Sequence, residues 1–114
     1  MRKLRSILVT LLAVVLIAGT ALATLKWQKA FNDLYKPSAD SQIKKAKCAL
    51  CHLDDKGKKG LNPYGKLLQK KKKAEPGSFK AVEKLDADKD GFSNIDEIKA
   101  GTLPGDPKSK PPKK

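Results

Sequence analysis

The apolar run at the start of the chain limits how much of it can fold. Three basic residues among the first five precede a nearly wholly apolar stretch over residues 7–18, and Ala21-Leu22-Ala23 then supplies the small residues that signal peptidase recognises. We predict a signal peptide over residues 1–23. Because the uncharged stretch over residues 6–25 is twenty residues long, an uncleaved membrane anchor is the alternative. In both cases the rest of the chain is exported, to the periplasm or an equivalent compartment.

The exported part is small and strongly basic. Loss of the three N-terminal cations leaves 22 of the 25 basic residues against 12 acidic ones, a net charge of +10. This balance favours an acidic partner protein or an anionic membrane surface. Nucleic acid is not expected as a partner, because there is no recognition motif and no aromatic platform among the lysines. A solvated lysine surface without a partner is the alternative.

The spacing of apolar residues predicts short helices and no strand, so the expected fold class is all-α. The charged, glycine-rich residues 54–60 are expected to form a surface loop. Apolar residues are few for several short helices, and a chain of this size usually needs an additional staple. The expected helices cover residues 27–35 before Pro37, a segment from Ser38 or Asp40 to the cysteines, a segment from Asn62-Pro63 to Lys70–Lys73, a segment from Ser78 through Leu85, and a last one ended by Gly101-Thr102.

Both cysteines of the chain and its single histidine fall within five residues, Cys48-Ala49-Leu50-Cys51-His52. This Cys-x-x-Cys-His spacing is the attachment signature of a c-type haem. Two thiols three residues apart on a helical turn can each bond one vinyl group along one porphyrin edge, and the next residue then brings its imidazole under the ring to bind iron. We predict one covalent haem c on Cys48 and Cys51, with His52 as an iron ligand.

Other interpretations of this motif explain less. A thioredoxin-like redox pair would need a βαβ setting, which the apolar pattern does not provide. A disulfide between Cys48 and Cys51 suits an oxidising compartment but leaves His52 without a role. A zinc site would need a fourth ligand, for example Asp54 or Asp55.

With this motif the chain resembles the c-type cytochromes, in which the motif ends the first core helix. The resemblance implies thioether bonds at Cys48 and Cys51, His52 as proximal ligand, and a small helical domain packed on the haem over residues 24–77. Small electron-carrying cytochromes usually have a methionine or second histidine on the other side of the iron. Here the only methionine starts the signal segment and there is no second histidine, so the sixth position is open, water-filled, supplied by a partner, or taken by a weaker ligand such as a lysine or Tyr64.

The leading functional expectation is a monohaem cytochrome that passes single electrons to an acidic partner. We do not expect the protein to be an enzyme. The missing sixth ligand raises one alternative, an open-site haem protein that binds small gases or peroxide. A dedicated enzyme should offer a distal acid–base group, and the chain has no free histidine to serve as one.

The segment over residues 86–97 (DADKDGFSNIDE) carries oxygen ligands at positions 1, 3, 5, 9 and 12 of a twelve-residue loop. Glycine at position 6 permits the sharp turn that such a loop needs, and calcium takes six to eight hard oxygens. We therefore predict a Ca²⁺ site. Its expected ligands are the carboxylates of Asp86, Asp88, Asp90 and Glu97, the carbonyl of Phe92, and Asn94 directly or through water.

The loop resembles EF-hand and related extracellular calcium loops. Position 8, which is aliphatic in paired EF-hands, is Ser93, and there is no second loop; the single calcium loops of exported bacterial proteins are the nearer likeness. The resemblance implies a weak, structural calcium site in an EF-hand-like region over residues 78–103. Lysine and proline dominate residues 104–114 and predict a disordered tail. The alternatives are an acidic turn that binds nothing, or a calcium-binding interaction module without haem.

Overall fold

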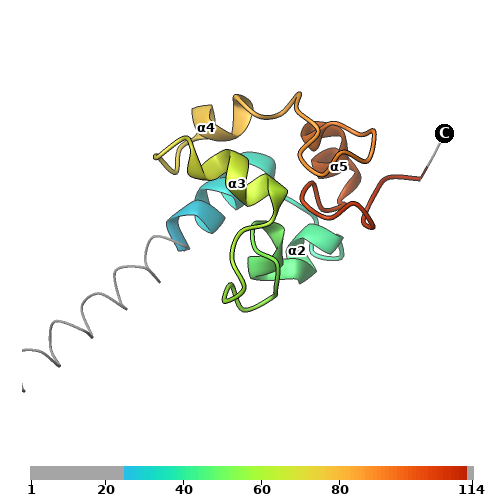
Figure 1. Ribbon diagram of the computed structural model, residues 1–114, viewed down its shortest axis with the longest axis horizontal. Helices are drawn as coiled ribbons and strands as arrows, with labels where there is room; N and C mark the ends of the chain where they lie inside the picture. Colours follow the sequence, from blue (N-terminus) through green and yellow to red (C-terminus); the bar gives the residue numbers. More distant parts are fainter. Residues whose placement is uncertain (1–24, 113–114) are drawn as a thin grey trace, which may run out of the picture.

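The computed structural model describes residues 25–112, so the predicted signal segment over residues 1–23 lies outside the described residues. Residues 25–35 are helical and are followed by α2 (Gln42–Ala46), the 3-10 helix η1 (Lys47–Leu50), α3 (Pro63–Gln69), α4 (Pro76–Lys80) and α5 (Asn94–Ala100) (Figure 1). The described part holds no strand, only an isolated antiparallel bridge between His52 and Leu61. The all-α prediction is confirmed. No helix within residues 25–112 has the length and apolar character to cross a bilayer.

Local capping residues place the helix ends. Asn62 accepts a hydrogen bond from the Gly65 amide with Pro63 at the first helical position, as predicted for the start of α3. The predicted starts of two other helices are wrong by a few residues. Ser41, rather than Ser38 or Asp40, caps α2 by accepting from the Lys44 amide.

The fourth predicted helix also begins earlier than expected. Pro76, which suits the first helical position because its φ is already helical, opens α4 after Glu75. The predicted cap Ser78 lies inside the helix, and its hydroxyl donates to the Lys73 carbonyl at 2.7 Å. The lysine run that was expected to close α3 follows that helix, which ends at Gln69.

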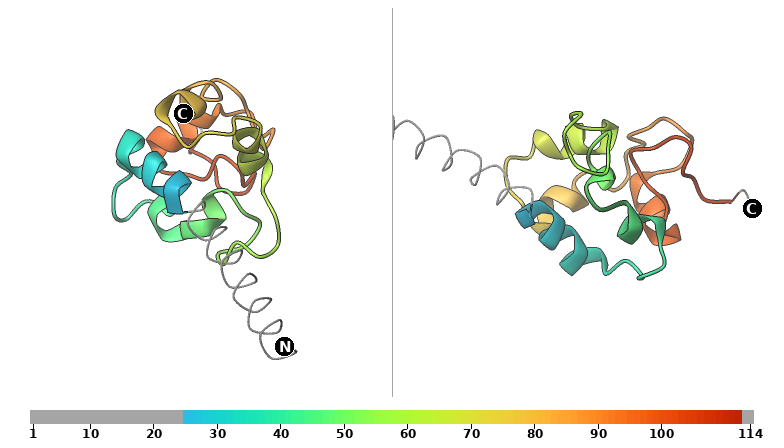
Figure 2. Two further views of the ribbon diagram at one scale, coloured as in Figure 1. Left: turned by 90° about the vertical axis from the view of Figure 1, so that its left-hand side faces the viewer. Right: turned by 90° about the horizontal axis from the view of Figure 1, so that it is seen from below.

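Aromatic side chains from three segments form the centre of the core. The centroid of the Phe31 ring lies 5.7 Å from that of Phe79 and 6.4 Å from that of Tyr64, and both pairs have edge-on geometry. Such pairs add about 0.5–1.5 kcal/mol each to the burial of the rings themselves. The buried apolar residues are Phe31, Ile43, Leu50, Tyr64, Leu68, Phe79, Val82 and Ile98. Figure 2 shows α4 at one end of this arrangement and α5 at the other.

The chain beyond α5 is ordered, which contradicts the predicted disordered tail for residues 104–109. We call residues 102–110 the C-terminal strap; it turns back from α5 toward α2 (red in Figure 1). Pro104 is fully buried, and Ser109 is buried with its hydroxyl accepting from the Leu103 amide at 2.9 Å. The same hydroxyl donates to Gln42. The prolines are therefore part of an ordered strap. The prediction was wrong because it rested on composition, which does not reveal long-range contacts.

Candidate functional site

The Cys-x-x-Cys-His motif lies on η1 and the turn that follows it. The amides of Cys51 and His52 both donate to the Cys48 carbonyl, at 3.2 and 2.9 Å, which folds the motif into a tight turn. Both cysteines are free thiols and half-buried. Burial, together with the neighbouring Cys48, raises the pKa of the Cys51 thiol to about 12. The turn therefore brings two free thiols and one imidazole together without a disulfide.

One buried amide holds this turn in place. Asn62 donates from Nδ2 to the carbonyl oxygens of Ala49 and Leu50 at 3.0 Å and of His52 at 3.3 Å. Its Oδ1 accepts from the Gly65 amide, and its own backbone amide donates to the Cys51 carbonyl at 2.9 Å. Asn62 is therefore both the cap of α3 and a clamp on the motif ten to thirteen residues earlier.

Close packing reinforces the clamp. A Cβ atom on Gly65 would come within 2.1 Å of the Cys51 carbonyl oxygen, so only glycine lets α3 approach the motif this closely. Sequence reasoning identified Asn62 as a cap but missed its contact with the motif, and it assigned no role to Gly65. The available signal was the glycine three residues after the cap, which a helix interior does not favour.

The imidazole of His52 is oriented by the backbone. Nδ1 lies 3.2 Å from the Gly60 carbonyl, and because a carbonyl only accepts, Nδ1 carries the proton and Nε2 keeps its lone pair. An Nδ1–H to carbonyl bond is the usual outer-shell support of a metal-binding histidine. Gly57, in a left-handed conformation (φ +70°), lies beside the ring; a Cβ there would be 3.6 Å from Nε2. The absent side chain leaves space next to the free nitrogen.

An apolar cavity of about 230 Å³ adjoins the motif. Cys48, Cys51 and His52 line it together, so the structure brings all three predicted attachment residues to one wall. Gln28, Lys47 and Gln69 are the polar side chains of the remaining lining. The apolar lining residues are Trp27, Phe31, Leu50, Leu61, Leu68 and Phe79.

Tyr64 is not among the residues that line the cavity. It is fully buried in the core, its hydroxyl has no hydrogen-bond partner in the structure, and burial raises its pKa well above the ordinary value. The structure thus gives Tyr64 a place in the core and no direct access to the cavity, where a sixth iron ligand would have to lie.

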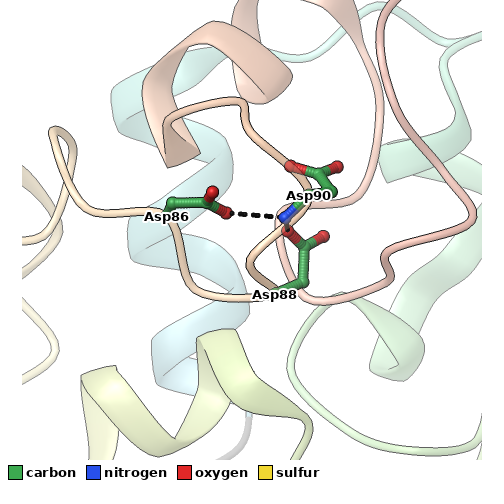
Figure 3. Close-up of side chains that lie close together, drawn as sticks. All are labelled: Asp86, Asp88 and Asp90. Carbon is green, nitrogen blue, oxygen red and sulfur yellow. Dashed lines mark hydrogen bonds between the residues drawn. The ribbon is translucent and has the colours of Figure 1, made fainter.

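The acidic loop has the tightly turned backbone that a metal loop requires. Oxygens of Asp86, Asp88 and Asp90 lie within 4.8 Å of one another (Figure 3). The Asp90 and Gly91 amides donate to the two Asp86 oxygens, at 3.2 and 2.9 Å. Gly91 has a φ of +94°, which confirms the predicted sharp turn at loop position 6. The Phe92 amide donates to Asp90 at 3.0 Å; its carbonyl as a ligand stays a prediction.

Glu97 is the most unusual residue of the loop. It is a carboxylate with an exposed fraction of 0%, and neither of its oxygens has a hydrogen-bond partner in the structure. Burial, then the proximity of Asp90, Asp88 and Asp86, raises its pKa to about 9. One oxygen each of Asp88 and Asp90 is also buried and unpartnered. Buried acidic oxygens without a hydrogen-bond partner are costly, and a cation bound among them would lower that cost.

Asn94 differs from its prediction as a calcium ligand. Its Oδ1 accepts from the Ala87 amide at 3.1 Å and its Nδ2 donates to the Val82 carbonyl at 2.9 Å. Both ends of the side chain are committed to the backbone, so Asn94 ties the loop to the segment before it. Ser93, at loop position 8, caps α5 by accepting from the Asp96 amide, which explains why an aliphatic residue is not needed there.

The zinc alternative finds no support in residues 25–112. Within this part of the chain, the only group of potential metal-binding side chains is Asp86, Asp88 and Asp90. Asp54, the suggested fourth ligand, accepts from the Lys59 amide at 3.0 Å instead. This bond lowers the pKa of Asp54 and braces the loop beside His52.

Comparisons with family models, with curated proteins and with solved structures found no match to this chain.

Proposed function

We propose that the chain is an exported c-type cytochrome that carries one haem on Cys48 and Cys51, with His52 as iron ligand. The observation that supports this proposal best is the cavity itself: the two thiols and the imidazole line one wall of an apolar space. A disulfide, a redox pair or a zinc site does not require such a space, whereas the apolar faces of a porphyrin require an apolar cavity.

The residues present fit the group. The Nδ1–H bond to Gly60 leaves Nε2 available for iron, and Gly57 keeps the adjacent volume free of a side chain. Trp27, Phe31 and Phe79 offer aromatic surface to a porphyrin. Because a porphyrin is larger than about 230 Å³ of cavity, one edge of an attached haem would reach the surface.

A haem held in this way supplies one-electron redox chemistry. The protein residues orient it, exclude water from its apolar faces and steer a partner toward the edge that reaches the surface. All lysines of the described part are exposed, among them Lys47 at the cavity and Lys56, Lys58 and Lys59 on the loop beside His52. This charge favours an acidic redox partner and fast association at low salt.

The lining of the cavity supports the alternative of an open iron site. Apart from His52, no lining residue is a histidine or methionine, the ligands found in most electron-carrying cytochromes. Small neutral gases are the ligands that this apolar lining suits. Outside the motif, Lys47 is the one titratable side chain in the lining, so we do not assign an enzymatic reaction.

The test of haem attachment uses protein recovered after export from a host that attaches haem to exported chains. The mass should exceed that of the polypeptide by one haem, and the colour should stay with the protein after acid–acetone extraction. The variant Cys48→Ser/Cys51→Ser should lose both properties. Wild-type protein without the mass increment would refute the cytochrome proposal.

We further propose that the loop over residues 86–97 binds one Ca²⁺ in an EF-hand-like manner. The unpartnered, fully buried Glu97 carboxylate supports this second function. Asp86, Asp88, Asp90 and Glu97 would supply hard oxygens that suit calcium. The ion would neutralise clustered like charges, and its role would be structural.

Calcium binding can be tested without haem. Titration calorimetry with calcium alone should show one site, with an affinity in the ~10⁻⁴ to 10⁻³ M range of extracellular modules. Glu97→Gln should abolish binding, whereas Asp96→Asn should retain it, because Asp96 is exposed on α5 outside the cluster. Equal binding by both variants would show that the loop is only an acidic turn. Calcium binding without haem attachment would favour the interaction-module alternative.

A further inference from the structure

The C-terminal strap reaches the clamp of the Cys-x-x-Cys-His motif. Gly105 is buried against the side chain of Asn62, so closely that a Cβ atom on Gly105 would lie 2.4 Å from Oδ1 and 2.6 Å from Nδ2 of Asn62. This amide holds the carbonyls of the motif. The strap therefore packs directly on the clamp and restricts its movement.

The other end of the strap begins at the acidic loop. The Thr102 amide and hydroxyl both donate to the Glu97 carbonyl, at 2.9 and 3.3 Å. Glu97 thus belongs to two structures at once: its side chain faces the aspartates of the loop, and its main chain holds the first residue of the strap. Gly101, with a φ of +78°, makes the turn between them.

We propose that calcium at the acidic loop, by fixing Glu97, tightens the strap over Asn62 and so holds Cys48, Cys51 and His52 in the arrangement that haem attachment needs. This regulation rests on the proposed haem and calcium functions. Because coupling between two sites is reciprocal, an attached haem that favours the closed motif raises the calcium affinity in turn.

Thiol reactivity measures this coupling without haem. In the reduced, haem-free full chain, calcium should slow alkylation of Cys48 and Cys51 by iodoacetamide by about fivefold or more, the lower end of ordinary coupling between sites. Gly105→Ala should bind calcium but lose most of this slowing, because its methyl group displaces the Asn62 amide. Gly77→Ala is the matched control, since a Cβ there meets nothing within 4 Å, and it should behave like the parent.

Each result decides between the proposals. Calcium binding without slower alkylation in the parent, or equal slowing in Gly105→Ala, would overturn the coupling while leaving the calcium site intact. Absence of calcium binding in the parent would refute the calcium site and the coupling together. If Gly105→Ala does not fold, as judged by circular dichroism, Ser109→Ala replaces it. Ser109→Ala removes the strap's bonds to Leu103 and Gln42 without touching Asn62.

Haem-bearing protein supplies the reciprocal measurement. Its calcium affinity, measured by calorimetry, should exceed that of the Cys48→Ser/Cys51→Ser variant. Equal affinities in the two proteins, with haem attachment demonstrated by mass, would overturn the coupling and leave the cytochrome proposal standing.

Discussion

The Cys-x-x-Cys-His motif and the acidic loop are both short candidate sites, but they differ in which of their groups have hydrogen-bond partners. At the motif, Asn62 bonds three carbonyls and the Gly60 carbonyl bonds the imidazole, beside an apolar cavity. At the loop, backbone amides bond the aspartates, but four carboxylate oxygens have no partner. A large apolar group would suit the first site and a cation the second.

This difference predicts how the free energy of unfolding of each half should behave in ligand-free protein, where the two halves are the part around the motif and the part around the acidic loop. Unfilled apolar volume costs packing energy but leaves the surrounding hydrogen bonds intact. Unpaired buried carboxylates repel one another and take up protons instead. We therefore expect the motif to keep its shape without haem, whereas the loop is destabilised without calcium in a pH-dependent way.

The largest effect should come from replacing the two buried asparagines, one in each half. Asn62→Leu removes four side-chain hydrogen bonds, one of which caps α3. We expect a loss of about 3–5 kcal/mol in the free energy of unfolding. Asn94→Leu removes two such bonds, with an expected loss of about 2–3 kcal/mol. Urea unfolding measures both values. A larger loss for Asn94→Leu would contradict our view that Asn62, at the motif, stabilises the fold more than Asn94, at the acidic loop.

A smaller effect should appear in the pH dependence of calcium-free protein. The folded state raises the pKa of Glu97 from 4.5 to about 9, so between these values folded protein holds a proton that unfolded protein has released. Stability should therefore fall as pH rises across this window. Burial also raises the pKa of Asp88 from 3.8 to about 7, so Glu97→Gln should remove only part of the slope, whereas calcium should flatten the profile. Urea midpoints at several pH values measure it.

The motif provides the control for this comparison. The pKa of Cys51 is also raised, from 9 to about 12, so its destabilising window begins only above pH 9. Replacing Cys51 with serine should leave the slope below pH 9 unchanged. A slope that disappears in Cys51→Ser and persists in Glu97→Gln would contradict the electrostatic difference between the halves.

The smallest effects concern two equivalent serine caps. Ser41 caps α2 and Ser93 caps α5, each with one hydrogen bond to a backbone amide. Replacing either with alanine should cost about 1 kcal/mol. Only Ser93→Ala should also weaken calcium binding, because α5 carries Glu97. Weaker calcium binding by both variants in calorimetry would show that α2 also influences the calcium affinity of the loop.

Local chemistry made much of this structure predictable. The spacing of Trp27 and Phe31 on a helical face, the Asn62-Pro63 start and the turn at Gly91 each follow from neighbours in sequence. The two candidate sites are predictable for the same reason, because both are continuous segments. Their attachment and acidic residues come together in the structure as the spacing indicated.

Contacts between distant segments were not predictable. Nothing in the composition of residues 104–114 reveals that Gly105 packs on Asn62 or that Ser109 bonds Gln42, so the strap was expected to be disordered. Asn94 suited the ninth ligand position by its type, but tertiary structure uses it to hold Val82 and Ala87. Polar side chains with several chemically equal uses are assigned by the fold and not by their position in a motif.

The bond between Ser109 and Gln42 joins residues 67 positions apart, and this separation has a consequence for the order of folding. A chain that is translocated from its N-terminus presents the motif to the exported side well before the strap arrives. Contacts of such long sequence separation also form slowly, because a large loop must close first. During this interval Asn62 is uncovered and the thiols of Cys48 and Cys51 are at their most accessible. Under the proposed coupling, attachment of a covalent group would therefore wait until the strap has crossed the membrane and closed over Asn62.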